Sequence, residues 1–432
     1  MPLQDVATVI MGQSPPSSAY NTEGEGLPFF QGKAEFGPLH PTPVKWCSAP
    51  TKVAESDDVL MSVRAPVGPT NLATERCCIG RGLAAIRAEP GVRSKWLLYA
   101  FRAMERSIDD LGTGTTFKAI SGETLRQIEV PVACLEEQDG AIAEIEKQFS
   151  RLDEAVASLK RVKANLKRYK VGVLKAAVEG RLLPTEAELA RSEGRAFETA
   201  AEHLTRVHAA RKDGRQGRAG RATRAREVTS ELPVLPPGWC WSDFETVADR
   251  VTVGHVGPMK DEYVAGGIPF LRSQNVRPNR YDPAGLKFIS PTFHSTLRKS
   301  ALEPGDIVVV RSGSVGVACV IPDSLPVANC SDLVIIKRPR GVLPSFGAYY
   351  LNSVVDSRIA AGRVGIALAH FNTQSVAKLP VPVPPLAEQV RIVAEVDRRV
   401  SIVREVEAEV DANMTRTNAL RSAVLASAFQ LQ

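Results

Sequence analysis

The sequence predicts an α+β protein with an internal duplication, in which each copy is a globular domain followed by a long helix. The first observation is a repeated motif: Val130–Gln138 reads VPVACLEEQ, and Val381–Gln389 reads VPVPPLAEQ. The second is that the chain aligns with itself without a gap over about 65 residues around this motif. The third is a change of pattern, because short β-type runs precede each motif and helical periodicity follows it. Together they predict two similar halves with internal pseudo-twofold symmetry.

The predicted helices are long and begin at the repeated motif. Apolar residues of the first helix recur at steps of three and four, which is the spacing of a coiled-coil seam. Two consecutive steps of three near Leu159 predict a local overwinding. The second seam is weaker, because Glu407 and Asn413 occupy core positions. We expect helices over 135–178 and 386–429, each about 66 Å long.

The two helices present matching apolar seams at the same register. Burying one seam against the other removes more apolar surface from water than leaving either exposed. The sequence therefore favours an antiparallel coiled coil between them. The alternative is that each helix packs only on the globular domain of its own copy.

The globular domains are predicted to contain twisted, mostly antiparallel sheets joined by long loops. Short β-type runs are seen in DVLMSV (Asp58–Val63), DIVVVR (Asp306–Arg311) and LVIIK (Leu333–Lys337). Helical stretches are few, and one is expected near 95–111 with a counterpart near 345–361. This pattern is typical of an α+β domain.

The composition changes between the two halves. Arg211–Glu227 is rich in arginine and glycine and has no apolar residue larger than alanine, so it cannot bury a core. It is either a flexible basic linker or an ordered DNA-binding arm. The predicted organisation is a first globular domain over 1–134, a helix over 135–180, a linker over 181–237, a second globular domain over 238–385 and a helix over 386–432.

The overall composition sets limits on the class of protein. The chain has 432 residues, a formal net charge of +6 and seven cysteines, of which no two have C-x-x-C spacing. The charge permits nucleic-acid binding, and the cysteines favour a reducing cytoplasm over a disulfide framework or zinc site. No apolar run is long enough for a transmembrane helix, and the start does not resemble a secretion signal.

Motifs that would carry chemistry are missing from the sequence. There is no phosphate-binding G-x-x-x-x-G-K-[ST] loop, no N/D-P-P-Y/F methyltransferase motif and no nuclease core. The six histidines include no pair at metal-binding spacing. These absences predict a chain without catalysis of its own. An enzyme with an unrecognised site is the alternative.

The duplicated arrangement of a globular domain and P-L-x-E-Q opening a long helix resembles the specificity subunit of type I restriction–modification systems. Further stretches carry the resemblance, among them SVRAPVGPTN (Ser62–Asn71), GIPFLRSQNVRPN (Gly267–Asn279) and ALEPGDIVVVRSG (Ala301–Gly313). It covers nearly the whole chain apart from the linker. One departure is that PPGWCW (Pro236–Trp241) opens the second domain but has no counterpart in the first, whose start is either truncated or late.

The resemblance implies that the globular domains are target-recognition domains and that the helices are a spacer. The expected target is double-stranded DNA with two unlike half-sites around an unread gap. The expected partners are two methyltransferase subunits and two restriction/translocase subunits. S-adenosylmethionine, ATP and Mg²⁺ are expected in those partners, with no cofactor or metal bound by this chain. The alternatives are a stand-alone architectural or regulatory DNA-binding protein and the same subunit in a type IIB-like system.

Candidate DNA contacts are polar residues in loops at strand ends, because Arg and Lys read guanine and Asn and Gln read adenine. Each of them is alternatively a surface residue or a phosphate contact, and Arg81 is either structural or a further contact. The residues that mark the repeated motif are the candidates for subunit docking. The predicted DNA contacts are Gln31, Lys33, Arg64, Thr116, Lys118, Arg272, Gln274, Asn275, Arg277, Arg311, Ser312, His370 and Asn372, and the docking residues are Leu135, Glu137, Gln138, Leu386, Glu388 and Gln389.

Overall fold

The computed structural model describes residues 1–114, 118–213, 232–360 and 372–429. The chain divides into two compact units. Unit 1 contains Met1–Val162 and Glu409–Gln432, and unit 2 contains Lys163–Ala408. Each unit therefore holds one globular domain together with a segment of each long helix.

Unit 1 has two sheets. In the first, the strand order is β1-β9-β6-β7 and all pairs are antiparallel; in the second it is β2-β4-β3-β8-β5, with one parallel pair between β3 and β8. The strands are β1 (Ala7–Met11), β2 (Tyr20–Asn21), β3 (Leu27–Phe30), β4 (Lys45–Cys47), β5 (Val53–Ala54), β6 (Val59–Ser62), β7 (Thr70–Leu72), β8 (Cys77–Ile79) and β9 (Leu83–Ala88). The expectation of mostly antiparallel sheets is confirmed.

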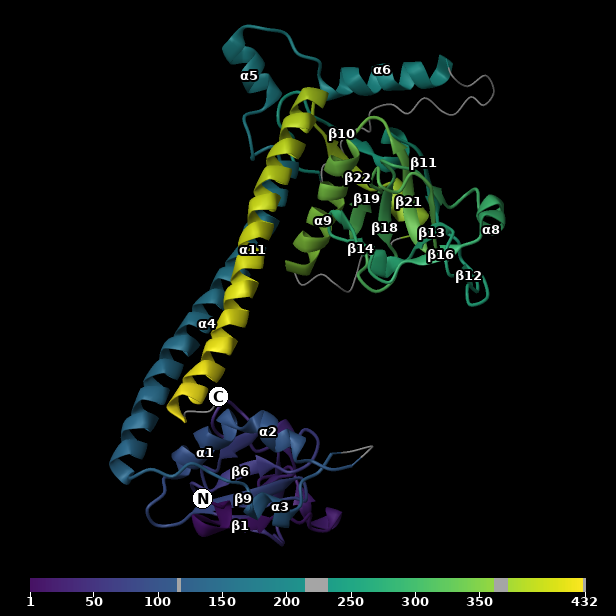
Figure 1. Cartoon of the computed structure of the whole chain (residues 1–432). Helices are drawn as coiled ribbons and strands as arrows, with labels where there is room; N and C mark the ends of the chain where they lie inside the picture. Colours follow the sequence, from purple (N-terminus) through teal and green to yellow (C-terminus); the bar gives the residue numbers. More distant parts are fainter. Residues whose placement is uncertain (115–117, 214–231, 361–371, 430–432) are drawn as a thin grey trace. The chain divides into compact units, whose positions relative to one another are not determined.

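The helices of unit 1 are short except for the long helix that leaves the domain. Helix α1 packs on the sheet that contains β6, β7 and β9 (Figure 1). It buries Leu97, Leu98 and Phe101, which are fully enclosed in the main core. The helices are α1 (Ser94–Ala103), α2 (Glu105–Asp110) and α3 (Gly122–Arg126), with 3₁₀ turns at η1 (Leu3–Asp5), η2 (Ser17–Ala19) and η3 (Lys33–Glu35).

Unit 2 repeats both sheets with the same strand order. The first sheet is β11-β21-β18-β19, and the second is β12-β16-β13-β20-β17 with its parallel pair between β13 and β20. Strand by strand, this reproduces the topology of unit 1. The strands are β11 (Ala248–Val253), β12 (Tyr263–Val264), β13 (Ile268–Leu271), β16 (Lys287–Ile289), β17 (Ala301–Leu302), β18 (Ile307–Val310), β19 (Ala318–Val320), β20 (Ala328–Cys330) and β21 (Leu333–Pro339).

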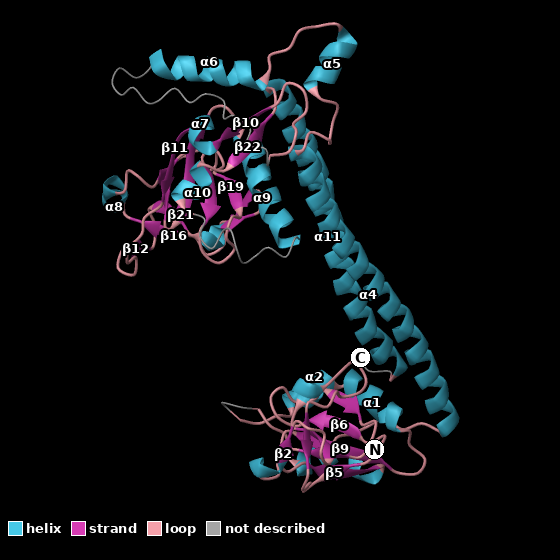
Figure 2. Cartoon of the chain, turned by 180° about the vertical axis from the view of Figure 1, so that it is seen from behind, coloured by secondary structure: helices cyan, strands magenta, loops and turns pink. Residues whose placement is uncertain are grey.

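Around its two sheets, unit 2 has further strands and helices. Two small sheets pair β10 with β22 and β14 with β15, and helix α9 packs on β18 and β19 (Figure 2). These elements are β10 (Cys240–Asp243), β14 (Val276–Arg277), β15 (Arg280–Tyr281), β22 (Pro380–Val383), α7 (Phe244–Val247), α8 (Pro291–Thr296), α9 (Pro344–Ala360), α10 (Thr373–Ala377) and η4 (Ser273–Asn275). Of them, α9 and α10 are the counterparts of α1 and α3 in unit 1.

The segment expected as a linker is partly folded, which corrects the prediction for its first half. Helices α5 (Glu186–Glu193) and α6 (Ala200–Asp213) lie within 181–237. Helix α5 begins with a capping box. The hydroxyl of Thr185 accepts from the N–H of Glu188, and the carboxylate of Glu188 accepts from the N–H of Thr185. Helix α6 buries Ala200 and Leu204 in the core of unit 2. The arginine-rich stretch beyond Asp213 lies outside the described residues up to 231.

The two long helices are α4 (Leu135–Val178) and α11 (Leu386–Ala428), close to the predicted limits. In unit 1, Ile145 near the start of α4 shares a core with Leu425 near the end of α11. In unit 2, Leu174 near the end of α4 shares a core with Val396 near the start of α11. The segments therefore pair antiparallel in each unit. The knobs-into-holes packing of a coiled coil stays a prediction.

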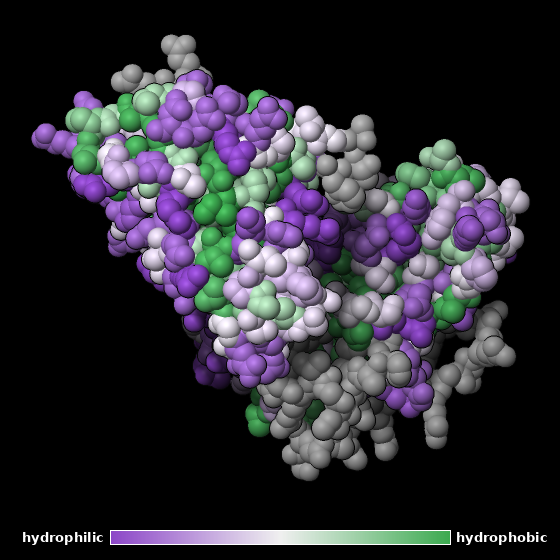
Figure 3. Space-filling view, turned by 90° about the horizontal axis from the view of Figure 1, so that it is seen from below, coloured by the Kyte–Doolittle hydropathy of each residue, from purple (hydrophilic) through white to green (hydrophobic). Residues whose placement is uncertain are grey.

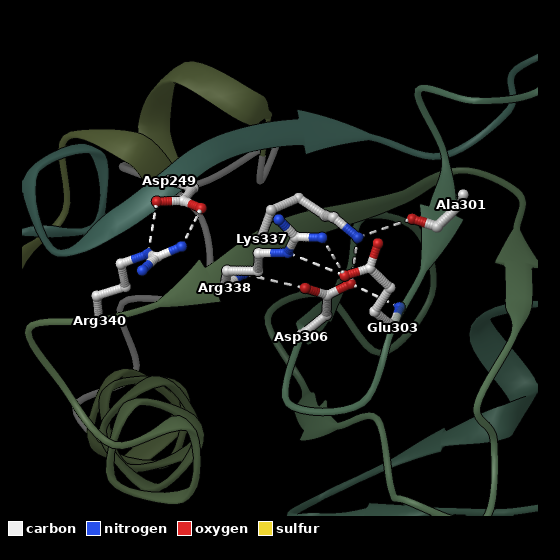
Figure 4. Close-up of polar contacts among 7 residues, drawn as sticks. All are labelled: Asp249, Ala301, Glu303, Asp306, Lys337, Arg338 and Arg340. Carbon is white, nitrogen blue, oxygen red and sulfur yellow. Dashed lines mark hydrogen bonds and ion pairs between the residues drawn. The ribbon is translucent and has the colours of Figure 1, made fainter. Parts of the chain in front are cut away.

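Each domain contains a buried aspartate in the turn that leads into the first sheet. These are Asp58, directly before β6, and Asp306, directly before β18. In unit 2, Asp306 is fully enclosed, accepts from the N–H groups of Glu303 and Arg338, and pairs with Lys337 at 2.5 Å (Figure 4). In unit 1, Asp58 pairs with Arg87 at 2.8 Å and is also buried. A buried carboxylate needs such partners, because desolvation strongly disfavours an unpaired charge.

No helix in the described part of the chain is long and apolar enough to span a bilayer. The face of the molecule drawn in Figure 3 mixes hydrophilic and apolar residues.

Candidate functional site

Four loops of unit 1 meet at one edge of the domain. The N–H of Gly80 donates to the carbonyl of Phe30 at 2.8 Å, and that of Val63 donates to Gly82 at 2.9 Å. The N–H of Ala65 donates to Lys118 at 2.9 Å. These bonds link the loops that follow β3, β6 and β8 with the segment before α3. We call the side chains that they carry the first rim: Gln31, Lys33, Arg64, Arg81 and Lys118.

The glycines around Arg81 make the close approach of these loops possible. A Cβ atom on Gly82 would lie 2.3 Å from the carbonyl oxygen of Gln31, and one on Gly80 would lie 3.1 Å from its Cα. A side chain at Gly82 would therefore clash with backbone. The close packing of the loops therefore requires the two glycines of GRG. Arg81, which lies between them, is exposed.

Most of the first rim is available for an external partner. The side chains of Gln31, Lys33, Arg64 and Arg81 are exposed and have no hydrogen-bond or ion-pair partner within the described ranges. Lys118 differs, because it pairs with Asp109 at 2.9 Å. That hydrogen bond raises the pKa of Lys118 and lowers the pKa of Asp109. The predicted contact Thr116 lies outside the described residues.

Unit 2 builds the equivalent edge with different side chains. The N–H of Ser331 donates to the carbonyl of Leu271 at 3.0 Å, just as Gly80 bonds to Phe30 in unit 1. Arg311, at the end of β18, pairs with Asp332 at 2.7 Å. Asp332 in turn donates its N–H to the carbonyl of His255. We call Arg272, Gln274, Arg277, Arg311 and His255 the second rim.

His255 was missed by reasoning from the sequence. Its N–H donates to Cys330 at 2.8 Å, as the N–H of Gln13 donates to Ile79 at 3.1 Å in unit 1. The imidazole packs edge-on against Phe293, with 5.8 Å between the ring centroids. The available signal was its place between Gly254 and Gly257, just after the β-type run Val251–Val253.

The loop after β13 is held together by internal hydrogen bonds that involve one of the predicted DNA contacts. The Asn275 side chain is completely buried, accepts from the N–H of Arg272 and donates to the carbonyls of Asp282 and Ala284. This corrects the prediction that Asn275 contacts a base, since its donors and its acceptor are already used within the loop. Arg277 is exposed and pairs with Asp282 at 3.1 Å, while Gln274 is exposed and donates to Gly285 at 3.2 Å.

The remaining DNA candidates of unit 2 are Ser312, His370 and Asn372. Asn372 is the N-cap of α10, where its side-chain oxygen accepts from the N–H of Ser375 at 2.8 Å. The equivalent residue of unit 1, Ser121, caps α3 in the same way. Asn372 is thus occupied by a local structural bond, although it is exposed. Ser312 is exposed, and His370 lies outside the described residues.

The repeated motif forms the join between each domain and its long helix. Gln138 is fully buried, accepts from the N–H of Arg93 at 2.8 Å and donates to the carbonyl of Ala133 at 2.8 Å. Gln389 is also fully buried, accepts from Leu343 at 2.7 Å and donates to Pro384 at 2.9 Å. These placements correct the prediction that the two glutamines dock another subunit, because their polar atoms already have partners in this chain.

The glutamate of the motif has different surroundings in the two copies. Glu388 is buried and accepts from the N–H of Glu186 at 2.8 Å and from Trp239 Nε1 at 3.0 Å. Burial raises the pKa of Glu388. Its counterpart Glu137 is exposed and accepts only from the N–H of Cys134 within the described chain. Glu388 is therefore excluded as a docking residue.

Trp239 and α5 explain this difference between the copies. Both belong to the segment that leads into the second domain, and they cover the start of α11. Leu135 and Glu137, at the start of α4, are exposed, and Leu386 is half-buried. Of the predicted docking residues, these three keep surface for a partner.

Comparison with known proteins gives one family. A family model described as type I restriction modification DNA specificity domain matches residues 1–168 and 254–410. The putative type I restriction enzyme MjaX specificity subunit of Methanocaldococcus jannaschii is 41% identical over 175 residues, which are 40% of each chain. The type I restriction enzyme EcoBI specificity subunit of Escherichia coli is 20% identical over 99% of this chain and 84% of that protein.

Solved structures include similar chains. The HsdS subunit from Thermoanaerobacter tengcongensis has 50% sequence identity and a TM-score of 0.33 over 38% of each chain. The S subunit of a type I restriction–modification system from M. genitalium has 12% identity and a TM-score of 0.36, over 99% of this chain and 95% of that one.

Proposed function

The chain belongs to the family of type I restriction–modification DNA specificity proteins, and on this premise we propose that it is the subunit that reads the DNA target. One observation carries the proposal. The two domains have the same strand order in both sheets, but their rims carry different side chains. A shared scaffold with unlike contacts is what two readers of two unlike half-sites require.

The chemistry of the rims supports contact with DNA. Lys33, Arg64 and Arg81 are exposed cations without a carboxylate partner in the part of the chain that the structure describes. Such cations bind phosphates, and an arginine or lysine fork also reads the guanine edge in the major groove. The second rim holds Arg311 and Arg277 against Asp332 and Asp282, which fixes their direction before binding.

The target is proposed to be bipartite and asymmetric. Two recognition domains that read the same side of a duplex contact it about one helical turn apart, or about 34–36 Å. The helices α4 and α11 are proposed as the spacer that sets this separation. Their lengths of 44 and 43 residues suit that role.

The chain is proposed to act without catalysis of its own, in a complex with other subunits. The partners are two methyltransferase subunits, which bring S-adenosylmethionine, and two restriction/translocase subunits, which bring ATP and Mg²⁺. Leu135 and Glu137 are the exposed residues of the repeated motif that we propose for docking.

The test is to map N6-methyladenine across the genome of the source cell, with and without this gene. We expect one bipartite motif to lose its methylation on deletion and to regain it on complementation. Exchange of residues 2–133 for the first domain of a relative should change one half-site and leave the other intact.

A second measurement separates the proposed function from its alternatives. Co-purification should yield a complex of two methyltransferase subunits with one copy of this chain, which a stand-alone architectural protein would not form. The purified chain alone should neither methylate nor cleave DNA. Methylation or cleavage by the chain alone would contradict the proposal.

A further inference from the structure

Arg311 of the second rim forms an ion pair with Asp332, and both side chains reach the surface. Nη1 of Arg311 lies 2.7 Å from Oδ1 of Asp332, and the side chains are 31% and 40% exposed. Within the described part of the chain, this contact is the only hydrogen bond of either side chain. Oδ2 of Asp332 and the Nε and Nη2 groups of Arg311 are accessible to solvent, so they are available to an external ligand.

Backbone contacts fix the position of Asp332. Its N–H donates to the carbonyl of His255 at 3.0 Å, and the N–H of His255 donates to Cys330 at 2.8 Å. A Cβ atom on Gly254 would lie 2.8 Å from the carbonyl oxygen of Cys330, so a side chain there would clash with backbone. Asp332 has a φ of 30°, in the left-handed region, which aspartate adopts more readily than most residues. The carboxylate is therefore held in place before any ligand binds.

The first copy shows that the fold does not require a carboxylate at this turn. The turn between β8 and β9 has three residues, Gly80–Gly82, and the turn between β20 and β21 has two, Ser331 and Asp332. Both turns are bonded in the same way to the strand beside them, through the N–H of Gly80 or Ser331. Unit 1 carries the exposed cation Arg81 here, whereas unit 2 carries an acid. The charge at this turn is therefore a property of each domain and not of the shared scaffold.

A carboxylate on a rim that faces DNA is repelled by the phosphates, so its presence calls for a favourable contact with a base. In the major groove, guanine offers the acceptors N7 and O6, and the paired cytosine offers the N4 donor. An arginine next to an aspartate presents two donors followed by an acceptor, which matches this order. An A·T pair presents acceptor, donor and acceptor instead, so it does not match.

We propose that Arg311 and Asp332 together read one G·C base pair in the half-site of the second domain. Nε and Nη2 of Arg311 donate to guanine, and Oδ2 of Asp332 accepts from N4 of the paired cytosine. Oδ1 of Asp332 holds Nη1 and thereby directs the guanidinium. This inference rests on the proposed function, and it adds the identity of one base pair and a role in specificity for Asp332.

The first experiment measures binding of the assembled methyltransferase to duplexes in which each base pair of this half-site is exchanged in turn. The half-site is the one that remains unchanged when residues 2–133 are replaced. In the wild type, exchange of one G·C pair for A·T should weaken binding about tenfold or more. Asp332→Asn should reduce that penalty to about twofold, because an amide has one acceptor oxygen and cannot serve both Arg311 and cytosine.

The second experiment measures binding to a random duplex at fixed salt. Asp332→Asn should bind it more tightly than the wild type, because a charge that the phosphates repel has been removed. Arg311→Met should bind it more weakly. A purely structural role of Asp332 predicts no gain on random DNA. The double variant R311M/D332N should lose no more discrimination than Arg311→Met alone, since both residues act on one base pair.

Asp249→Asn is the matched control, because Asp249 pairs with Arg340 at 2.9 Å beyond the other end of β21 (Figure 4). It should discriminate as the wild type does. If Asp332→Asn fails to fold, Asp332→Gly takes its place, since glycine adopts a positive φ without strain.

The inference is overturned if no G·C pair of the half-site shows the penalty, or if the penalty persists in Asp332→Asn or its glycine replacement. In either case a bipartite target leaves the proposed function standing. The absence of any bipartite target overturns both.

Discussion

Gln138 and Gln389 make the same two connections in the two copies of the fold. Each carboxamide donates to the carbonyl five residues earlier and accepts from a backbone N–H at the start of the helix on the sheet, at Arg93 or Leu343. Both side chains are fully buried. The repeated motif is therefore the point at which each domain is fastened to its long helix.

We predict that Gln138→Leu or Gln389→Leu destabilises the unit that contains it by about 1–3 kcal/mol, since each change leaves a buried N–H without an acceptor. Urea unfolding measures the loss. Gln148→Leu is the control, because this glutamine of α4 bonds only to the neighbouring Glu144. Equal stability of all three variants would contradict the fastening role.

The ion pairs of Figure 4 predict a contrast between two cations three residues apart, Lys337 and Arg340. Lys337→Met leaves Asp306, which is completely buried, without its ammonium partner and should cost about 3–5 kcal/mol. Arg340→Met removes an exposed partner of Asp249 and should cost about 1 kcal/mol or less. Denaturant unfolding of both variants provides the comparison. A similar loss for both would show that the burial of Asp306 is not decisive.

Gln274 of the second rim and its buried neighbour Asn275 should separate recognition from stability. Gln274→Ala should lower binding to the cognate site by about 1–3 kcal/mol and leave binding to random DNA unchanged, as expected for a base contact. Asn275→Ala should instead reduce stability, because its three hydrogen bonds hold the loop. Competition binding of the assembled methyltransferase at fixed salt measures the first effect. Equal losses on both DNAs would assign Gln274 to the backbone.

A change in the length of α4 tests its proposed role as a spacer. Insertion of four residues after Leu159 adds about 6 Å of helix. The unread gap of the target should lengthen by one or two base pairs, or assembly should fail. The same insertion after Gly194, which ends α5, is the control and should leave the gap unchanged. An unchanged gap with full activity after the α4 insertion would remove the spacer role.

The raised pKa of Glu388 predicts a pH-dependent stability. The folded protein binds the Glu388 proton more tightly than the unfolded chain, so the wild type loses stability as pH rises from the ordinary carboxyl value through the raised one. Glu388→Gln mimics the protonated form and should therefore gain stability relative to the wild type over that interval. Urea unfolding from about pH 4 to about pH 8 tests this.

The matched control for that series is Glu137→Gln, at the exposed equivalent position of unit 1. A loss of stability in Glu388→Gln at neutral pH would mean that the attraction of the Glu388 charge to the nearby charge of Arg391 outweighs its burial.

The sequence by itself determined the duplication, the two long helices and the α+β class. These follow from local information, because a repeated motif, a spacing of three and four and short β-branched runs such as Ile307–Val310 depend on neighbours along the chain. The predicted seam shows the limit of such reasoning. Val162 and Tyr169 hold core positions in the sequence pattern but are 39% and 47% exposed, just after the predicted overwinding.

Only the tertiary structure decided which polar residues are free to act. Asn275 and Gln274 are adjacent and chemically alike, yet one is buried and saturated and the other is exposed. Gln138 and Gln389 looked like docking residues because the motif repeats, but they bond within the chain. Hydrogen-bond partners such as Arg93 and Ala284 come from separate segments, so the burial of a side chain depends on packing that no local pattern contains. For the same reason, the hydrogen bond from Arg102 to the carbonyl of Thr70 became visible only in the folded chain.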